Sequence, residues 1–138
     1  DADGSKGLSI AGLDMFWSQG PLEVVAEAAV VNIDEKSTYP QEMNGYYVEG
    51  RYHFMPEFLK DTFLTEGFDH PTFTAIARLS KVDTDTATTD ANDVTTTTLG
   101  LNYRPIENAV FKVEYEINTE ETGETDNNAF VSSVAVGF

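Results

Sequence analysis

The fold is decided by the last stretch of the chain, Phe130-Val131-Ser132-Ser133-Val134-Ala135-Val136-Gly137-Phe138, whose residues alternate in character. In an extended strand, every second residue from Phe138 back to Phe130 would share one face, and the other face would carry mainly small side chains. The first face is apolar, with an aromatic residue at each end. This pattern predicts a β-strand with one apolar face and one face of mainly small side chains.

Six further segments are rich in valine, threonine, tyrosine and phenylalanine, the residues that strands prefer. The sequence predicts seven strands, at residues 8–17, 21–33, 45–55, 71–82, 95–104, 108–118 and 129–138. No helical stripe competes with them, apart from a turn or two around residues 57–63. We therefore expect an all-β protein.

The connections between these strands are of two kinds, and the two kinds alternate along the chain. Short or simple connections are expected at residues 18–20, 56–70 and 104–107, and polar, acidic ones at 34–44, 83–94 and 119–128. Short turns at one end and long polar loops at the other are typical of an antiparallel up-and-down transmembrane β-barrel, with the short turns in the periplasm. Residues 56–70 are too long for a minimal turn. Because they include apolar Phe58, Leu59, Phe63 and Leu64, we expect them to form a packed periplasmic connection.

Aromatic residues gather near both ends of the predicted apolar face. With Phe138 at the periplasmic end, the periplasmic group is Trp17, Phe54, Phe73, Tyr103 and Phe138, and the extracellular group is Tyr46, Tyr115 and Phe130. Two aromatic girdles around an aliphatic band are expected where amphipathic rings meet the two membrane–water interfaces. The apolar face is therefore expected to meet lipid.

Two alternatives remain open from the pattern alone. A soluble all-β binding module, such as a sandwich or a lipocalin-like barrel, shows the same alternation with its apolar face turned inward. A structural barrel that scaffolds a partner is the third possibility.

The opposite face carries charges of both signs, which need either water or partners. The candidate pore-lining residues are Glu49, Arg51, His53, Arg78, Lys112, Glu114 and Glu116. Side chains of this kind in a pore wall influence ion preference. Alternatively, the basic residues among them form ion pairs with Glu49, Glu114 and Glu116 and only compensate the charges of the barrel wall.

Composition excludes several functions. The chain has 24 acidic residues against 8 basic ones and a formal charge of -16, so it would repel a phosphate backbone and we expect no nucleic-acid partner. It has no cysteine, and His53 and His70 lie in unrelated contexts, so we expect neither a metal nor a cofactor. We find no set of residues in a catalytic arrangement, and so expect no enzyme. The sequence also has no run of about eighteen apolar residues, which a transmembrane helix would need.

Several phrases resemble the last strands of porins: Gly45–Tyr52, Phe73–Leu79, and Leu99–Pro105 followed by Phe111–Tyr115. They are similar to the phosphate-selective porin (porin O and P) superfamily. The resemblance implies an outer-membrane channel for passive diffusion of small hydrophilic solutes or ions, in contact with outer-membrane lipid and lipopolysaccharide. It also implies that Phe138 is a signal for the barrel-assembly machinery and that a homotrimer is one expected assembly. Phosphate selectivity is not carried over, because acidic residues exceed basic ones on the polar face.

The strand count bears on domain organisation. Seven strands place the N-terminus at the extracellular end, whereas a complete bacterial barrel has an even number of strands. We therefore expect residues 1–138 to be the C-terminal part of a larger outer-membrane β-barrel.

Overall fold

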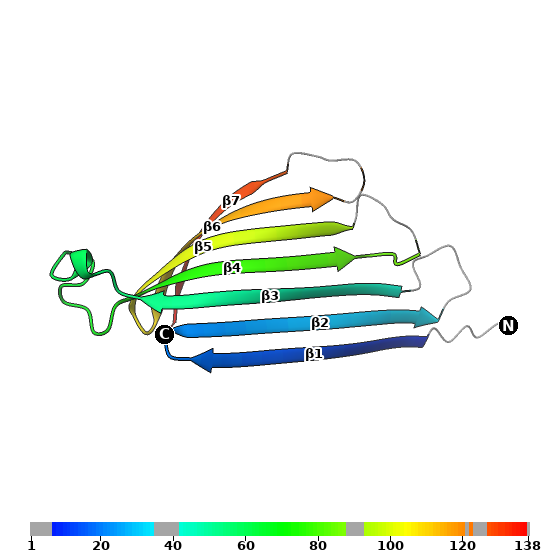
Figure 1. The fold of residues 1–138 in the computed structure, drawn as a ribbon, viewed down its shortest axis with the longest axis horizontal. Coiled ribbons are helices and arrows are strands. Elements are labelled where there is room, and N and C mark those ends of the chain that lie inside the picture. The colour runs from blue at the N-terminus through cyan, green and yellow to red at the C-terminus, as the bar shows by residue number, and fades with distance from the viewer. Residues whose placement is uncertain (1–6, 35–41, 88–92, 121, 123–126, 138) are drawn as a thin grey trace.

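The computed structural model of the chain describes residues 7–34, 42–87, 93–120, 122 and 127–137 (Figure 1). Its strands are β1 (Gly7–Gln19), β2 (Leu22–Asp34), β3 (Glu42–Phe54), β4 (Thr72–Asp83), β5 (Val94–Ile106), β6 (Ala109–Glu120) and β7 (Ala129–Val136). All seven predicted strands are confirmed, with ends that differ by at most three residues.

The strands form one curved sheet in which each strand is antiparallel to the next (Figure 1). Their spatial order is their order in the sequence, which confirms the predicted up-and-down arrangement. β1 and β7 are both odd-numbered in this order and therefore run in the same direction. The sheet is open at these two edges, which cannot pair antiparallel with each other.

Two of the hairpin turns are as short as antiparallel geometry allows. Gln19 pairs with Leu22, so the β1–β2 loop has two residues, and Gly20 in its first position has a φ of 59°. Glycine suits this position because it adopts a positive φ without steric cost, and the resulting turn follows the twist of the strands. The β5–β6 loop also has two residues, since Ile106 pairs with Ala109 after a register shift. Tight turns of this kind fix the register of the strands they join.

The β3–β4 connection is longer and contains a short 3₁₀ helix, η1 (Glu57–Leu59). The hydroxyl of Thr65 donates a hydrogen bond to the carbonyl of Leu59 over 2.8 Å, and the hydroxyl of Thr62 donates to the same carbonyl over 2.7 Å. These bonds join the residues after η1 to its last residue, so the connection forms a compact turn. The helical turn predicted in this region is confirmed.

The same connection is anchored to the sheet by Tyr103, whose hydroxyl donates a hydrogen bond to the carbonyl of Leu64. Leu59 and Leu64 are half-buried, as a packed connection requires. Phe58 and Phe63, however, are 80% and 83% exposed. The expectation that all four apolar residues pack is therefore wrong for the two phenylalanines, which are largely exposed.

Cross-strand register sorts the side chains onto two faces. One face, here the apolar face, includes the row Trp17, Val24, Gly50, Ala77, Leu99, Tyr115 and Phe130. Among the side chains that the structure describes, its charged residues are Glu42, Lys81 and Asp83, all close to the start of β3 or the end of β4. Between Tyr46 and Phe54 of β3 it is free of charge over roughly 26 Å, at about 3.3 Å per residue. That is about the height of the lipid-facing band of a barrel.

The sheet has no hydrophobic core of its own. Across the described residues no hydrophobic side chain is fully buried, and Leu13 and Leu99 on the apolar face are 75% and 54% exposed. A sandwich would need a second sheet over this face, whereas the described strands form a single layer. No helix in the described part of the chain is long and apolar enough to cross a membrane.

Candidate pore-lining site

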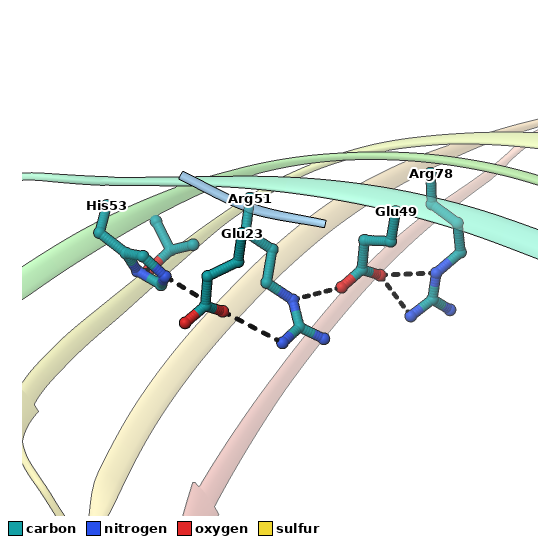
Figure 2. A network of polar contacts seen from close by, with 6 residues as sticks. Glu23, Glu49, Arg51, His53 and Arg78 are labelled. Carbon is teal, nitrogen blue, oxygen red and sulfur yellow. Dashed lines mark hydrogen bonds and ion pairs between the residues drawn. The ribbon is translucent and has the colours of Figure 1, made fainter. Parts of the chain in front are cut away.

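The other face, here the polar face, lies on the inner side of the sheet's curvature (Figure 2). This face is hollowed. The hollow has a volume of about 490 Å³ and is lined by residues of β2 to β6 that register places on this face. Six predicted pore-lining residues lie along it: Glu49, Arg51, His53, Arg78, Lys112 and Glu114. Glu116 lies outside the hollow but on the same face, opposite Thr98. The structure therefore brings the predicted set together on one face.

Glu49 is the centre of this face. Its Oε1 accepts a hydrogen bond from Nε of Arg51 over 2.5 Å, and its Oε2 accepts one from Nε of Arg78 over 2.6 Å (Figure 2). Glu49 lies directly opposite Arg78 across the β3–β4 ladder, and Arg51 follows two residues later on the same face of β3. Only 2% of Glu49 is exposed, so the two guanidinium groups compensate a carboxylate that the wall has almost removed from water.

The network continues onto β2 through Glu23. Its Oε2 lies 3.6 Å from Nη1 of Arg51 and 3.3 Å from Nε2 of His53 (Figure 2). The other ring nitrogen of His53, Nδ1, is 2.8 Å from the hydroxyl of Thr74 on β4. The side chains of Glu23, Arg51, Glu49 and Arg78 thus alternate in sign across three strands, and we call them the charge ladder.

Arg78, the last residue of the charge ladder, also contacts the aromatic ring of Tyr47. The guanidinium carbon of Arg78 lies 5.0 Å from the centroid of the Tyr47 ring, within the range of a cation–π interaction. Arg78 is therefore held by a carboxylate and by a ring.

The β5–β6 part of the polar face is organised differently. Within the described chain, neither Lys112 nor Arg104 has a carboxylate within 4.0 Å, and Glu114 and Glu116 have no basic group at that distance. Glu114 instead lies against Gly100, where an added Cβ would approach the Glu114 Cγ to 3.0 Å. The pairing expected with Glu49 is confirmed, and the pairing expected with Glu114 and Glu116 is wrong. Their cross-strand partners carry no charge: Gly100 and Thr98 on β5, and Val131 and Ala129 on β7.

Three contributors to the network were not among the predicted site residues: Glu23, Tyr47 and Thr74. Alternation places all three on the polar face, and this is the only signal that the sequence offers for them. Their partners depend on the β2–β3 and β3–β4 registers, which follow long connections rather than tight turns.

The predicted aromatic residues lie on the apolar face wherever the structure describes them. The rings of Tyr52, Phe54, Phe73, Tyr103 and Phe111 form a continuous row, with successive centroids 5.8, 6.1, 4.8 and 6.2 Å apart. This row brings together three of the predicted residues and adds Tyr52 and Phe111. At the other predicted level, Tyr115 lies opposite Phe130. Phe138 lies outside the described residues, and the role of these rings as membrane girdles stays a prediction.

A single antiparallel layer with a charged inner face and an exposed outer face whose middle is uncharged is the architecture of a porin-type β-barrel wall. The family model for phosphate-selective porin O and P matches residues 2–137, and the chain belongs to this family. No curated protein and no solved structure matches the chain significantly. The family indicates a porin-type channel rather than an enzyme.

Proposed function

We propose that the protein is a diffusion channel of the bacterial outer membrane, and that these strands form part of its wall. Small hydrophilic solutes and ions would pass along the polar face, and the apolar face would meet lipid. The observation that carries the proposal is the segregation of charge. Acidic and basic residues line the inner face, whereas the middle of the outer face has none among the described side chains.

The same face suggests a weak preference for cations. Its described carboxylates are Asp14, Glu23, Glu27, Glu49, Glu114, Glu116 and Glu120, and its basic residues are Arg51, Arg78, Arg104 and Lys112. A wall with an excess of carboxylates raises the local concentration of cations and lowers that of anions.

The contacts of the channel follow from the same orientation. We propose that the acidic connections at 34–44, 83–94 and 119–128 face lipopolysaccharide outside the cell, where divalent cations would bridge like charges. Phe138 is proposed as the group that the barrel-assembly machinery recognises, and a homotrimer as the assembly.

Conductance of the intact protein in a planar lipid bilayer tests the proposal. We expect discrete current steps whose size rises in proportion to bulk salt, and a reversal potential in a potassium chloride gradient that shows a modest excess of cation current. Raising the salt should reduce this excess, because ions screen the wall charges. A protein that remains monodisperse in buffer without detergent and gives no current steps would contradict the proposal.

A further inference from the structure

Glu49 lies between the guanidinium groups of Arg51 and Arg78. Its Oε1 accepts a hydrogen bond from Arg51 over 2.5 Å and its Oε2 accepts one from Arg78 over 2.6 Å, so both oxygens of the carboxylate have a guanidinium partner. Phosphate oxygens make the same charge-assisted bonds with guanidinium groups as carboxylate oxygens do. Nε of Arg51 and Nε of Arg78 are therefore already engaged by a residue of the chain itself.

The two arginines are nevertheless within reach of the pore. Both line the hollow, and their side chains are 35% and 43% exposed, whereas that of Glu49 is almost completely covered. Among the described residues, Glu49 is the sole carboxylate within 4.0 Å of Arg78. Arg51 has a second one, Glu23, at the longer distance of 3.6 Å. Removing the charge of Glu49 would thus leave two guanidinium groups facing water in the hollow.

We propose that Glu49 determines the anion specificity of this wall by masking a two-arginine oxyanion site. With Glu49 in place, the wall has no free site for a tetrahedral oxyanion at the charge ladder, and anions pass without binding there. Without its charge, Arg51 and Arg78 bind inorganic phosphate. Glu49 acts through the two arginines and does not itself touch the solute. The inference rests on the proposed channel function.

The test is a titration of the chloride current of the intact protein with inorganic phosphate, comparing the wild-type channel with Glu49→Gln. Glutamine keeps the shape of the side chain and removes its charge. We expect no saturable block of the wild-type current up to the highest phosphate concentration used, and a saturable block of the variant whose half-blocking concentration lies at least about tenfold below that limit. A tenfold change is within what charge-assisted hydrogen bonds to an oxyanion contribute.

Glu116→Gln is the matched control, because Glu116 lies on the same face and contacts no basic residue in the described chain. It removes the same formal charge, so it should move the reversal potential toward anions but produce no saturable block. The double variant Glu49→Gln, Arg78→Gln should lose the block again. If Glu49→Gln and Glu116→Gln respond to phosphate alike, net charge alone governs the pore and the masking proposal is wrong.

The outcomes separate this inference from the function on which it rests. A wild-type protein that forms no channel contradicts the proposed function. A wild-type channel that phosphate already blocks at millimolar concentration contradicts the masking by Glu49, and this arm does not depend on any variant assembling. A Glu49→Gln channel that opens normally and is not blocked contradicts it as well.

Discussion

Tyr103 connects the sheet to the β3–β4 connection through two different groups. Its ring stacks on Phe73 with centroids 4.8 Å apart, and its hydroxyl donates to the carbonyl of Leu64. Tyr103→Phe keeps the ring contact and removes the hydrogen bond, leaving the carbonyl without that donor. We expect the free energy of unfolding, measured by urea titration in lipid vesicles, to fall by about 1 kcal/mol.

Tyr52→Phe provides the control for that measurement. Tyr52 belongs to the same aromatic row, with its ring 5.8 Å from that of Phe54, but its hydroxyl makes no hydrogen bond within the described part of the chain. Its replacement should change the free energy of unfolding by less than about 0.5 kcal/mol. Equal losses in the two variants would show that the contact with Leu64 does not stabilise the fold.

At the scale of the strand, the apolar face of β5 offers a direct test of lipid contact. Leu99 lies near the middle of β5, is 54% exposed and pairs with Ala77 and Tyr115 of the neighbouring strands. An arginine at this position would carry its charge into the bilayer, at a cost of about 2–4 kcal/mol near the midplane. Leu99→Arg should therefore strongly reduce the fraction of protein that folds into vesicles, measured by resistance to protease.

Asn102→Arg, on the same strand, is the matched control. Asn102 lies on the polar face opposite Thr74 and Lys112 and lines the hollow, where an added cation remains in water. Assembly should be close to that of the wild type, and the channel should become less favourable to cations. If both arginine variants assemble equally well, the face that includes Leu99 does not meet lipid.

The strands also show how far the sequence predicts this fold. In β6, Lys112, Glu114 and Glu116 alternate with Val113 and Tyr115, so a period of two assigns both faces correctly. β1 does not permit this assignment. Phe16 shares the face of Val25 and Glu49, whereas Leu13 and Trp17 lie on the apolar face, so both sides of the strand carry apolar residues.

Pairing across strands is less predictable than alternation within them. A two-residue loop such as Gly20–Pro21 fixes the register of β1 on β2 by itself. The register of β3 on β4 follows a connection that contains η1, and its length alone does not determine it. The sequence therefore predicts Glu49 and Arg78 on one face but not opposite each other, which is the contact on which the charge ladder depends.

For the molecule as a whole, the two faces and the open edges have a common physical cause. A curved single layer cannot bury its outer apolar face within itself, and burying charge on the inner face would cost several kcal/mol per unpaired group. A bilayer around the sheet and water within its curve satisfy both faces. In the proposed channel, the backbone groups at the edges of β1 and β7 would also require partners in the bilayer, and we expect further strands to supply them.

Trp17, the one tryptophan of the chain, reports on this arrangement. It lies on the apolar face close to the β1–β2 turn and is 45% exposed. In vesicles, lipids with quenching groups should reduce its fluorescence, and Trp17→Phe gives the background signal to subtract. Aqueous iodide should quench it little, because the side chain would be surrounded by acyl chains and headgroups.

The depth of quenching distinguishes a transmembrane wall from a sheet that lies on the bilayer surface. Trp17 is expected near an interface, so quenchers attached close to the headgroup should be the most effective. A tryptophan introduced as Leu99→Trp in the Trp17→Phe background should instead respond most to quenchers near the bilayer centre, because Leu99 lies midway along β5. If both tryptophans respond most to the same shallow quencher, the strands do not cross the membrane, and the apolar face rests on the lipid surface.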